Sequence, residues 1–469
     1  MSEIVDTAES APVPPLPEPA RPPAAVDLSP LFILMSIGLL VGIVLERPKI
    51  WYTVNDASRW NTIYYLVQHG TYEFLPLSRE QLPKWANRPS PAKDPDPADP
   101  GNVPVLWTID MIRVDGKLCS PKPPLLPTVL AGVAWITQKV SGCTFQDNPR
   151  VIVRTILIVA QVIPLAIGLV LLRRHVFRIT ESPFARNFAM AAAAFGTYLT
   201  PWSVTLNNHV IAACTGMIAV DAFVRIWYDE RREWYWFALA AFFAAFTAAT
   251  ELPAGLLMVV VLAGLLIRDR RRTLGVGLIA AAVPIAAALY TNYLVTGGIK
   301  PAYMSKNVKG GFYDYPGSYW NDPQGIDNIK EPKSVYLGNL VIGHDGFFSL
   351  TPILLVSLLG IGSQIGRPGD RRLLAAVTLA MTAIVIAVYV VKTSDYGGGC
   401  QGYRWLFWLL PLWLLFLPVG AEWMDRVGGR VILYWLLAIS IFSVGYALDN
   451  PWTNSWLRTL FNQAGWIDY

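Results

Sequence analysis

The chain has few charged residues, few cysteines and few histidines, and each shortage argues against a class of protein. Charged residues make up 15% of the 469 residues, against 54% hydrophobic residues and a mean hydropathy of +0.39. This composition is too apolar for a water-soluble surface and predicts a membrane protein. The four cysteines form no CxxC pair and the four histidines are scattered, so zinc and redox motifs have no support. We therefore predict no cofactor and no metal, with a divalent ion left as an open alternative.

Apolar runs of nearly the ~20 residues needed to cross a bilayer recur along the chain. They predict an all-α polytopic membrane protein of about eleven transmembrane helices. The first run follows an acidic, proline-rich leader without the features of a cleaved signal, so it is interpreted as a retained span after a disordered cytoplasmic tail, residues 1–27. The predicted spans are 28–45, 151–172, 187–203, 208–227, 234–250, 252–267, 273–294, 346–365, 372–391, 404–420 and 430–447.

Arginines mark one side of this predicted topology. If the N-terminus is cytoplasmic, every short inside loop is basic, as the positive-inside rule requires. The arginines concerned are Arg173, Arg174, Arg178, Arg231, Arg232, Arg268, Arg270, Arg271, Arg272, Arg367, Arg371, Arg372, Arg426 and Arg430. The net charge of +5 is thus a topology signal and predicts no nucleic-acid partner. The candidate chemistry then lies outside, which for a bacterial inner membrane is the periplasmic side; an endoplasmic reticulum protein with a lumenal site would have the same pattern.

Two long outer loops, 46–150 and 295–345, interrupt the spans of the predicted membrane domain, 28–450, and a short outer tail, 451–469, follows it. Long loops of this kind often carry function. The first loop is predicted to contain an amphipathic interfacial helix starting at Asn55-Asp56, a proline-rich insertion over 75–118, and a second helix over 123–139 lying at the outer membrane surface. Cys119 and Cys143 in this loop could form a disulfide in an oxidising compartment.

Four short motifs lie on the outer side of the predicted topology. An acidic residue and amphipathic helix after the first span lead to Lys122-Pro-Pro-Leu-Leu126. The others are Asn292-Tyr-Leu-Val-Thr-Gly-Gly298, Gly343-His-Asp-Gly-Phe-Phe-Ser-Leu-Thr-Pro352 and Gly397-Gly-Gly-Cys-Gln-Gly-Tyr-Arg-Trp405. In their order and common sidedness, these motifs resemble those of GT-C-type glycosyltransferases, in particular the aminoarabinose-transferase and protein O-mannosyltransferase group, and the resemblance extends over most of the chain.

The resemblance implies a membrane enzyme that moves a hexose or pentose from a polyprenyl-phosphate donor to an acceptor hydroxyl of a lipid, glycan or protein, with inversion. It places Asp56 as the general base that takes the hydroxyl proton. Asp56 is also well placed simply to cap the interfacial helix, and the two roles are compatible. The chain departs from the family in having Ala57 where a second carboxylate is common, and in the longer separation of Asp56 from Lys122.

The leaving lipid phosphate requires fixed cations, for which Lys122 and Arg404 are the candidates; a snorkelling lysine and an interfacial anchor are the structural alternatives. Residues predicted to contact substrate are Trp60, Tyr64, Asn208, His209, Glu251, His344, Asp345, Gly398 and Gln401. Helix caps, turns and interfacial placement are the alternative explanations for these residues. The competing function is a transporter or lipid-linked sugar flippase, supported by the many spans and by Glu251 and Asp221 in apolar surroundings. The clustering of polar motifs outside, rather than at the membrane midplane, favours the enzyme.

Overall fold

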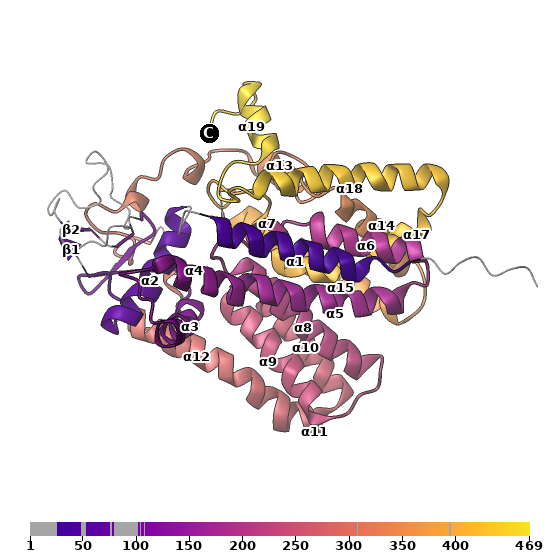
Figure 1. The fold of residues 1–469 in the computed structure, drawn as a ribbon, viewed down its shortest axis with the longest axis horizontal. Coiled ribbons are helices and arrows are strands. Elements are labelled where there is room, and N and C mark those ends of the chain that lie inside the picture. Colours follow the sequence, from indigo (N-terminus) through magenta and orange to yellow (C-terminus); the bar gives the residue numbers. More distant parts are fainter. Residues whose placement is uncertain are drawn as a thin grey trace, which may run out of the picture.

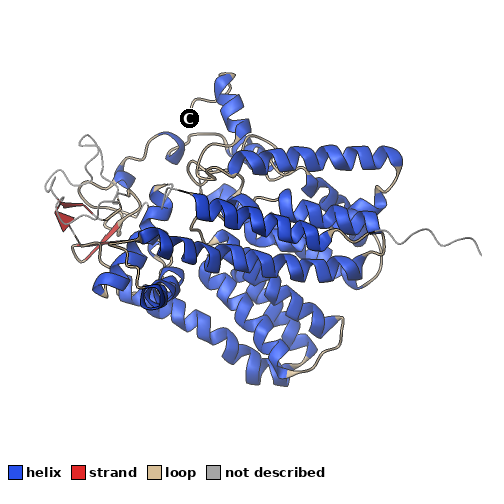
Figure 2. Ribbon diagram, viewed as in Figure 1, coloured by secondary structure: helices blue, strands red, loops and turns tan. Residues whose placement is uncertain are grey.

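The computed structural model describes residues 26–47, 53–75, 77–78, 102–103, 105–106, 108–306, 308–393 and 395–469. Residues 1–25 of the predicted tail over 1–27, and most of the proline-rich insertion, lie outside the described residues. Within them the protein is a bundle of α-helices, with two short β-hairpins at one end (Figure 1, Figure 2). The predicted all-α membrane fold is therefore confirmed in outline.

The bundle is built from helices that are apolar along most of their length. Figure 1 shows α1, α5 and α18 lying along the long axis of the molecule, with α9, α10 and α12 on the opposite flank. The bundle helices are α1 (Ser29–Glu46), α4 (Pro149–Leu157), α5 (Ile163–Ile179), α6 (Pro183–Phe195), α7 (Leu199–Trp202), α8 (His209–Trp227), α9 (Trp234–Thr250), α10 (Gly255–Arg268), α11 (Arg270–Arg272), α12 (Leu278–Thr296), α14 (Ile353–Ile365), α15 (Asp370–Lys392), α16 (Leu410–Leu414), α17 (Leu417–Trp423) and α18 (Val427–Ala447). A π-helical turn, Ile158–Val162, joins α4 to α5, and another, Thr273–Gly277, leads into α12.

Six helices in the described part of the chain are long and apolar enough to cross a membrane, or seven if the bent pair Arg404–Leu414 and Leu417–Trp423 counts as one span. The two halves of that pair meet at 58°. Three shorter apolar helices, Trp234–Thr250, Leu252–Arg268 and Ile353–Ile365, accompany them. The structure therefore does not confirm the predicted count of eleven spans.

The shortfall has local causes. The predicted span over 187–203 is interrupted because α6 ends at Phe195, before Gly196, and only a single helical turn follows. The predicted span over 346–365 starts late because α14 begins only after Pro352, and the preceding residues form turns. Glycine costs helix stability and so ends a helix within apolar sequence, whereas proline is tolerated at the start of a helix but not in its interior, so it marks where a helix begins.

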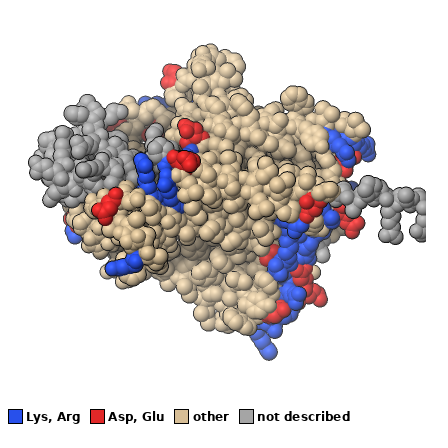
Figure 3. Space-filling model, viewed as in Figure 1, with Lys and Arg blue, Asp and Glu red and all other residues tan. Residues whose placement is uncertain are grey.

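The arginines gather at one end of the bundle, as the sequence predicted. Arg174 pairs there with Asp221 at 2.6 Å and with Asp229 at 2.9 Å, which ties α5 to the far end of α8. Arg225 bonds the other oxygen of Asp221 at 2.7 Å. Figure 3 shows basic and acidic side chains along this end of the molecule, with a largely uncharged surface over the helices between the ends. Asp221 thus serves helix packing at the arginine-rich end.

The opposite end carries the two long loops that the sequence predicts to be outside, and these keep the name outer loops below. The first holds α2 (Val54–His69), the hairpin of β1 (Leu77–Ser78) and β2 (Asn102–Val103), the hairpin of β3 (Ile112–Val114) and β4 (Lys117–Cys119), and α3 (Leu125–Ser141). The second holds 3-10 turns and α13 (Lys333–Val341), and α19 (Trp456–Gln463) follows α18 near the same end. Figure 1 views α3 end-on while α1 and α5 lie in the plane, so α3 runs across the bundle. That orientation, with Trp135 and Val140 exposed, agrees with a surface helix.

Candidate functional site

Seven ionisable side chains from separate segments meet at the loop-bearing end of the bundle. They are Asp56, Arg59, Asp110, Lys122, His209, Glu251 and Arg404. All except Lys122 belong to residues less than 9% exposed. Ionised groups are costly to bury unless they are paired or hydrogen-bonded, so the contacts within this cluster decide what each group can do.

The helix α2 presents Asp56 and Arg59 because its first turn is firmly capped. Thr53 and Asp56 form a capping box, with the Thr53 backbone N–H donating to Asp56 Oδ1 at 2.9 Å. Gly70 ends the helix in the left-handed conformation. The second carboxylate oxygen of Asp56 accepts a hydrogen bond from Thr205 Oγ1 at 3.1 Å. Asp56 is fully buried and carries out the predicted capping role, which leaves the predicted base role open.

A chain of hydrogen bonds leads from Arg59 to Arg404 through α8 and the end of α9. Arg59 donates to the side-chain oxygen of Asn208, and the Asn208 amide donates to Glu251 Oε2. The same Glu251 oxygen lies 2.8 Å from His209 Nδ1, and Arg404 Nη1 lies 2.6 Å from His209 Nε2. Arginine can only donate, so Nε2 must be the accepting nitrogen and Nδ1 carries the proton toward Glu251.

Arg404 is held by a glycine-rich turn. Its Nη2 donates to the carbonyl of Gly397 at 2.9 Å. Gly397 has a φ of +91°, and a Cβ there would meet Arg404 Nε at 3.0 Å, so both the backbone conformation and the space require glycine. Among the described residues, neither Arg404 nor Arg59 has a carboxylate within salt-bridge distance. Two nearly buried guanidinium groups therefore lack a carboxylate counter-ion in the described part of the chain.

Lys122 differs from the arginines because it has a carboxylate partner. The β3–β4 hairpin reverses the chain between Asp110 and Lys122, with Ile112 opposite Cys119. Lys122 Nζ lies 2.7 Å from Asp110 Oδ2 as a result. Burial lowers the pKa of Lys122 to about 8, although the field of Asp110 acts in the opposite direction. Burial likewise lowers the pKa of Arg59 to about 10, helped by repulsion from Arg404.

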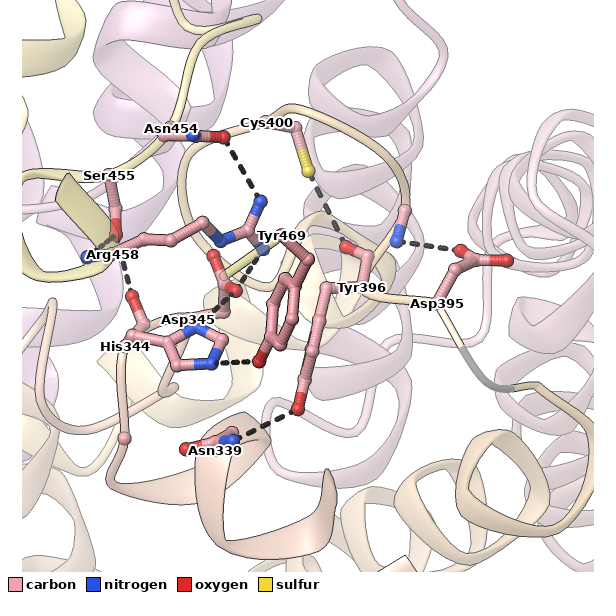
Figure 4. A network of polar contacts seen from close by, with 12 residues as sticks. Asn339, His344, Asp345, Asp395, Tyr396, Cys400, Asn454, Ser455, Arg458 and Tyr469 are labelled. Atoms are coloured by element: carbon pink, nitrogen blue, oxygen red, sulfur yellow. Dashed lines mark hydrogen bonds and ion pairs between the residues drawn. The ribbon is translucent and has the colours of Figure 1, made fainter. Parts of the chain in front are cut away.

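A second buried network lies on the far side of the glycine-rich turn (Figure 4). His344 Nδ1 lies 2.7 Å from Asp345 Oδ2, and His344 Nε2 lies 2.8 Å from the Tyr469 hydroxyl. Arg458, which is fully buried, pairs with Asp345 and reaches the carbonyl of Gly398 at 3.5 Å. This network joins α19 to the start of the α14 segment and to the turn that holds Arg404.

The structure brings together some of the predicted site residues and separates others. Asp56, Lys122, Asn208, His209, Glu251 and Arg404 share one cluster. His344, Asp345 and Gly398 belong to the second network instead. The Gln401 backbone N–H donates to the carbonyl of Pro451, in the segment after α18, at 2.9 Å.

Two further predicted residues lie on α2. Tyr64 packs against Phe145 and accepts a hydrogen bond from Gln146, which places it within the first outer loop. Trp60 is buried next to Arg59, and its indole nitrogen has no partner among the described residues.

Arg59 and Asp110 are members of the cluster that the sequence analysis did not select. The signal for Arg59 was available, because it lies three residues after Asp56 and therefore on the same helical face. Asp110 had no such signal, since its place depends on the β3–β4 hairpin. The disulfide that Cys119 and Cys143 could form is not present: Cys119 is buried, Cys143 is half-buried, and both are free. No group of three His, Cys, Asp or Glu side chains in the described part of the chain has metal-site geometry.

These features define a class: a helical membrane protein with a compact cluster of buried charges at one end, below two outer loops. Among solved structures, the fold is similar to ArnT from Cupriavidus metallidurans in the apo state, with a TM-score of 0.50 and 11% identity over 89% of this chain. The same protein bound to undecaprenyl phosphate gives a TM-score of 0.50 and 11% identity over 90% of this chain. This chain spans 64% of the ArnT chain in both cases.

A weaker similarity connects the chain with the oligosaccharyltransferase from Archaeoglobus fulgidus, with a TM-score of 0.45 and 12% identity over 90% of this chain and 53% of that one. No protein-family model matches the sequence, and no curated protein matches it. The ArnT similarity establishes a GT-C-type fold, which confirms the resemblance predicted from the sequence motifs.

Proposed function

We propose that the protein is a membrane glycosyltransferase that moves a sugar from a polyprenyl-phosphate donor to an acceptor hydroxyl at the outer leaflet, with inversion. The observation that carries the proposal is the pair of nearly buried guanidinium groups, Arg59 and Arg404, which have no carboxylate partner among the described residues; Arg59 also lies on the same helix as Asp56. A buried cation pair of this kind stabilises an anion between or beside its members, and guanidinium groups suit phosphate oxygens.

The site then divides into two functions. Arg59, Arg404 and Lys122 bind the phosphate and stabilise its charge as the bond to the sugar breaks. Asp56 accepts the proton of the attacking hydroxyl, a contribution of roughly 10²–10⁴-fold in rate. The similarity to an undecaprenyl phosphate-bound structure supports a polyprenyl phosphate as the lipid, and the arginine-rich end supports a cytoplasmic N-terminus with the site on the periplasmic face of a bacterial inner membrane.

The proposal is tested by transfer from radiolabelled polyprenyl-phosphate sugars to envelope fractions, with purified protein in liposomes. Asp56→Asn should retain the N-terminal cap of α2, because the amide oxygen can still accept the Thr53 N–H, and should lose at least about 100-fold in transfer. Asp221→Asn is the matched control, since Asp221 is a buried carboxylate at the other end of the bundle. Equal transfer by wild type and Asp56→Asn would remove Asp56 from the mechanism, and no transfer by wild type with any donor would favour a flippase.

A further inference from the structure

The segment after α18 reaches the carboxylate of Asp56 through two hydrogen bonds. Trp452, which is 7% exposed, donates its indole N–H to Thr205 Oγ1 at 3.0 Å. Thr205 Oγ1 in turn donates to Asp56 Oδ2 at 3.1 Å. Thr205 is 1% exposed, so water does not compete for its hydroxyl. Residues from three distant parts of the sequence therefore form one continuous chain of donors ending on the carboxylate.

The direction of these bonds follows from the chemistry of the groups. An indole N–H can only donate, whereas a hydroxyl donates one hydrogen bond and accepts up to two. Because Trp452 occupies one acceptor site of the Thr205 hydroxyl, the single hydroxyl proton is free to point at Asp56. The Thr53 backbone N–H donates to the other carboxylate oxygen at 2.9 Å. Both donors favour the ionised form of the carboxyl group, which is the form a general base needs.

Trp452 also contacts the phosphate side of the site. The Arg404 guanidinium carbon lies 5.3 Å from the centre of the Trp452 ring. The ring packs against Trp202 with centroids 4.5 Å apart, and Trp202 Nε1 donates to the Gln401 carbonyl at 2.9 Å. The backbone nitrogen of Gln401 donates to Pro451 O at 2.9 Å. The position of the indole is therefore fixed on two sides, by the Arg404 turn and by α7.

We infer that Trp452 and Thr205 are positioning residues, which orient the Thr205 hydroxyl proton onto Asp56 and keep this carboxylate ionised. The inference rests on the proposed role of Asp56 as base and adds the residues that maintain its protonation state. It assigns a function to the segment 451–469, which the sequence analysis treated only as a tail. In this scheme neither residue touches the reacting atoms.

Two measurements test the inference on the full-length protein in liposomes. The first is the pH dependence of sugar transfer, whose acid limb follows protonation of the base. The second is an infrared titration of the protonated carboxyl band of Asp56, assigned by subtraction of the Asp56→Asn spectrum, which needs no donor and no turnover. Thr205→Val removes the donated hydrogen bond with little change in shape, and the midpoint of both curves should rise by about one pH unit. Thr205→Ser keeps the hydroxyl and should restore the wild-type midpoint.

Trp452→Phe should shift both midpoints in the same direction by a smaller amount, because the hydroxyl remains but is no longer oriented. In the Thr205→Val background the same change should add no further shift, since the bond it acts through is absent. Trp456→Phe is the matched control, as the Trp456 indole bonds Ser443 Oγ at 2.8 Å on the same segment and away from Asp56. It should leave both midpoints unchanged.

A residue with only a packing role would change the melting temperature of the variants and leave the midpoints in place, and this result overturns the inference. Equal shifts from Trp452→Phe and Trp456→Phe overturn it as well. If wild type transfers no sugar but the infrared midpoints shift as expected, the hydrogen-bond chain stands and the assignment of Asp56 as a base in glycosyl transfer fails. The two proposals therefore fail separately.

Discussion

Replacing Asp110 by asparagine tests how a nearly buried lysine keeps the charge needed to bind phosphate. Lys122 Nζ lies 2.7 Å from Asp110 Oδ2, and burial has already lowered the pKa of Lys122 to about 8. Asparagine retains the size of the side chain and an oxygen that can accept from Lys122. The contact between Ser58 Oγ and the Asp110 backbone carbonyl, 2.7 Å, does not depend on the side chain. The substitution therefore removes one negative charge with little effect on the hairpin.

The magnitude follows from the separation of the two charges. An opposite charge at this distance favours the protonated lysine by about 1–3 pKa units, so the pKa of Lys122 should fall from about 8 to between about 5 and about 7 in Asp110→Asn. Near neutral pH the wild-type lysine is mostly charged, and the variant lysine becomes mostly neutral. A hydrogen bond between charged groups contributes about 1.5–3 kcal/mol, so donor affinity should fall by about 10- to 150-fold.

The assay is binding of a polyprenyl-phosphate sugar to protein in nanodiscs across a range of pH. This donor is a phosphodiester, whose own charge is constant over the range, so the pH dependence reports on the protein. Affinity of the wild type should decline as pH rises through about 8, because the cation is lost above the pKa of Lys122. In Asp110→Asn the decline should occur at lower pH, and affinity should recover on acidification.

Lys122→Arg supplies the control, because arginine stays charged throughout and should abolish the alkaline decline. Two results would refute the reasoning: an alkaline decline that persists unchanged in Lys122→Arg, or an Asp110→Asn curve that coincides with that of the wild type. The first would mean that another group titrates, and the second that Asp110 does not set the charge of Lys122.

Two further predictions concern the turn that holds Arg404. Arg404→Gln should weaken binding of the same donor by about 10- to 150-fold at every pH. Arg430→Gln, at the arginine-rich end, is the control and should leave donor affinity unchanged. Unchanged affinity in Arg404→Gln would remove Arg404 from phosphate binding. Arg458→Gln leaves Asp345 buried without its arginine and should destabilise the protein by about 3–5 kcal/mol, measured as a lower melting temperature. The double variant Arg458→Gln, Asp345→Asn should recover part of the lost stability. If it recovers none, the ion pair does not account for the loss.

Sequence patterns were informative wherever the cause of the structure is local. The apolar runs marked the helices, and the arginines marked one end of the bundle, because hydrophobicity and positive charge act segment by segment. Capping reasoning placed the start of α2 close to its position, although the N-cap residue is Thr53 and Asp56 contributes to the cap from within the first turn. The predicted count of eleven spans was not confirmed, because helix ends such as that of α6 before Gly196 interrupt apolar runs that were each interpreted as one continuous span.

The residues that sequence reasoning missed depend on contacts between distant segments. Asp110 reaches Lys122 through a hairpin inside a loop that seemed irregular, and Trp452 contacts Thr205 across 247 positions. His344 and Asp345 matched a family motif, but the arginine that explains their burial lies 113 positions beyond Asp345, in α19. No local periodicity encodes such pairings, so they required the fold.

The hydrogen-bond partners of Arg59 and Arg404 decide whether these two cations can bind an anion. Glu251 is the shared anchor: its Oε2 accepts from the Asn208 amide and faces His209 Nδ1. Asn208 then accepts from Arg59, and His209 accepts from Arg404. Direct ion pairs would have cancelled both guanidinium charges, whereas neutral amide and imidazole acceptors orient the two groups and leave their charge available. The Glu251 carboxylate thus positions Arg59 and Arg404 indirectly, through Asn208 and His209. In the proposed function, the phosphate of the donor is the anion that pairs with the two arginines.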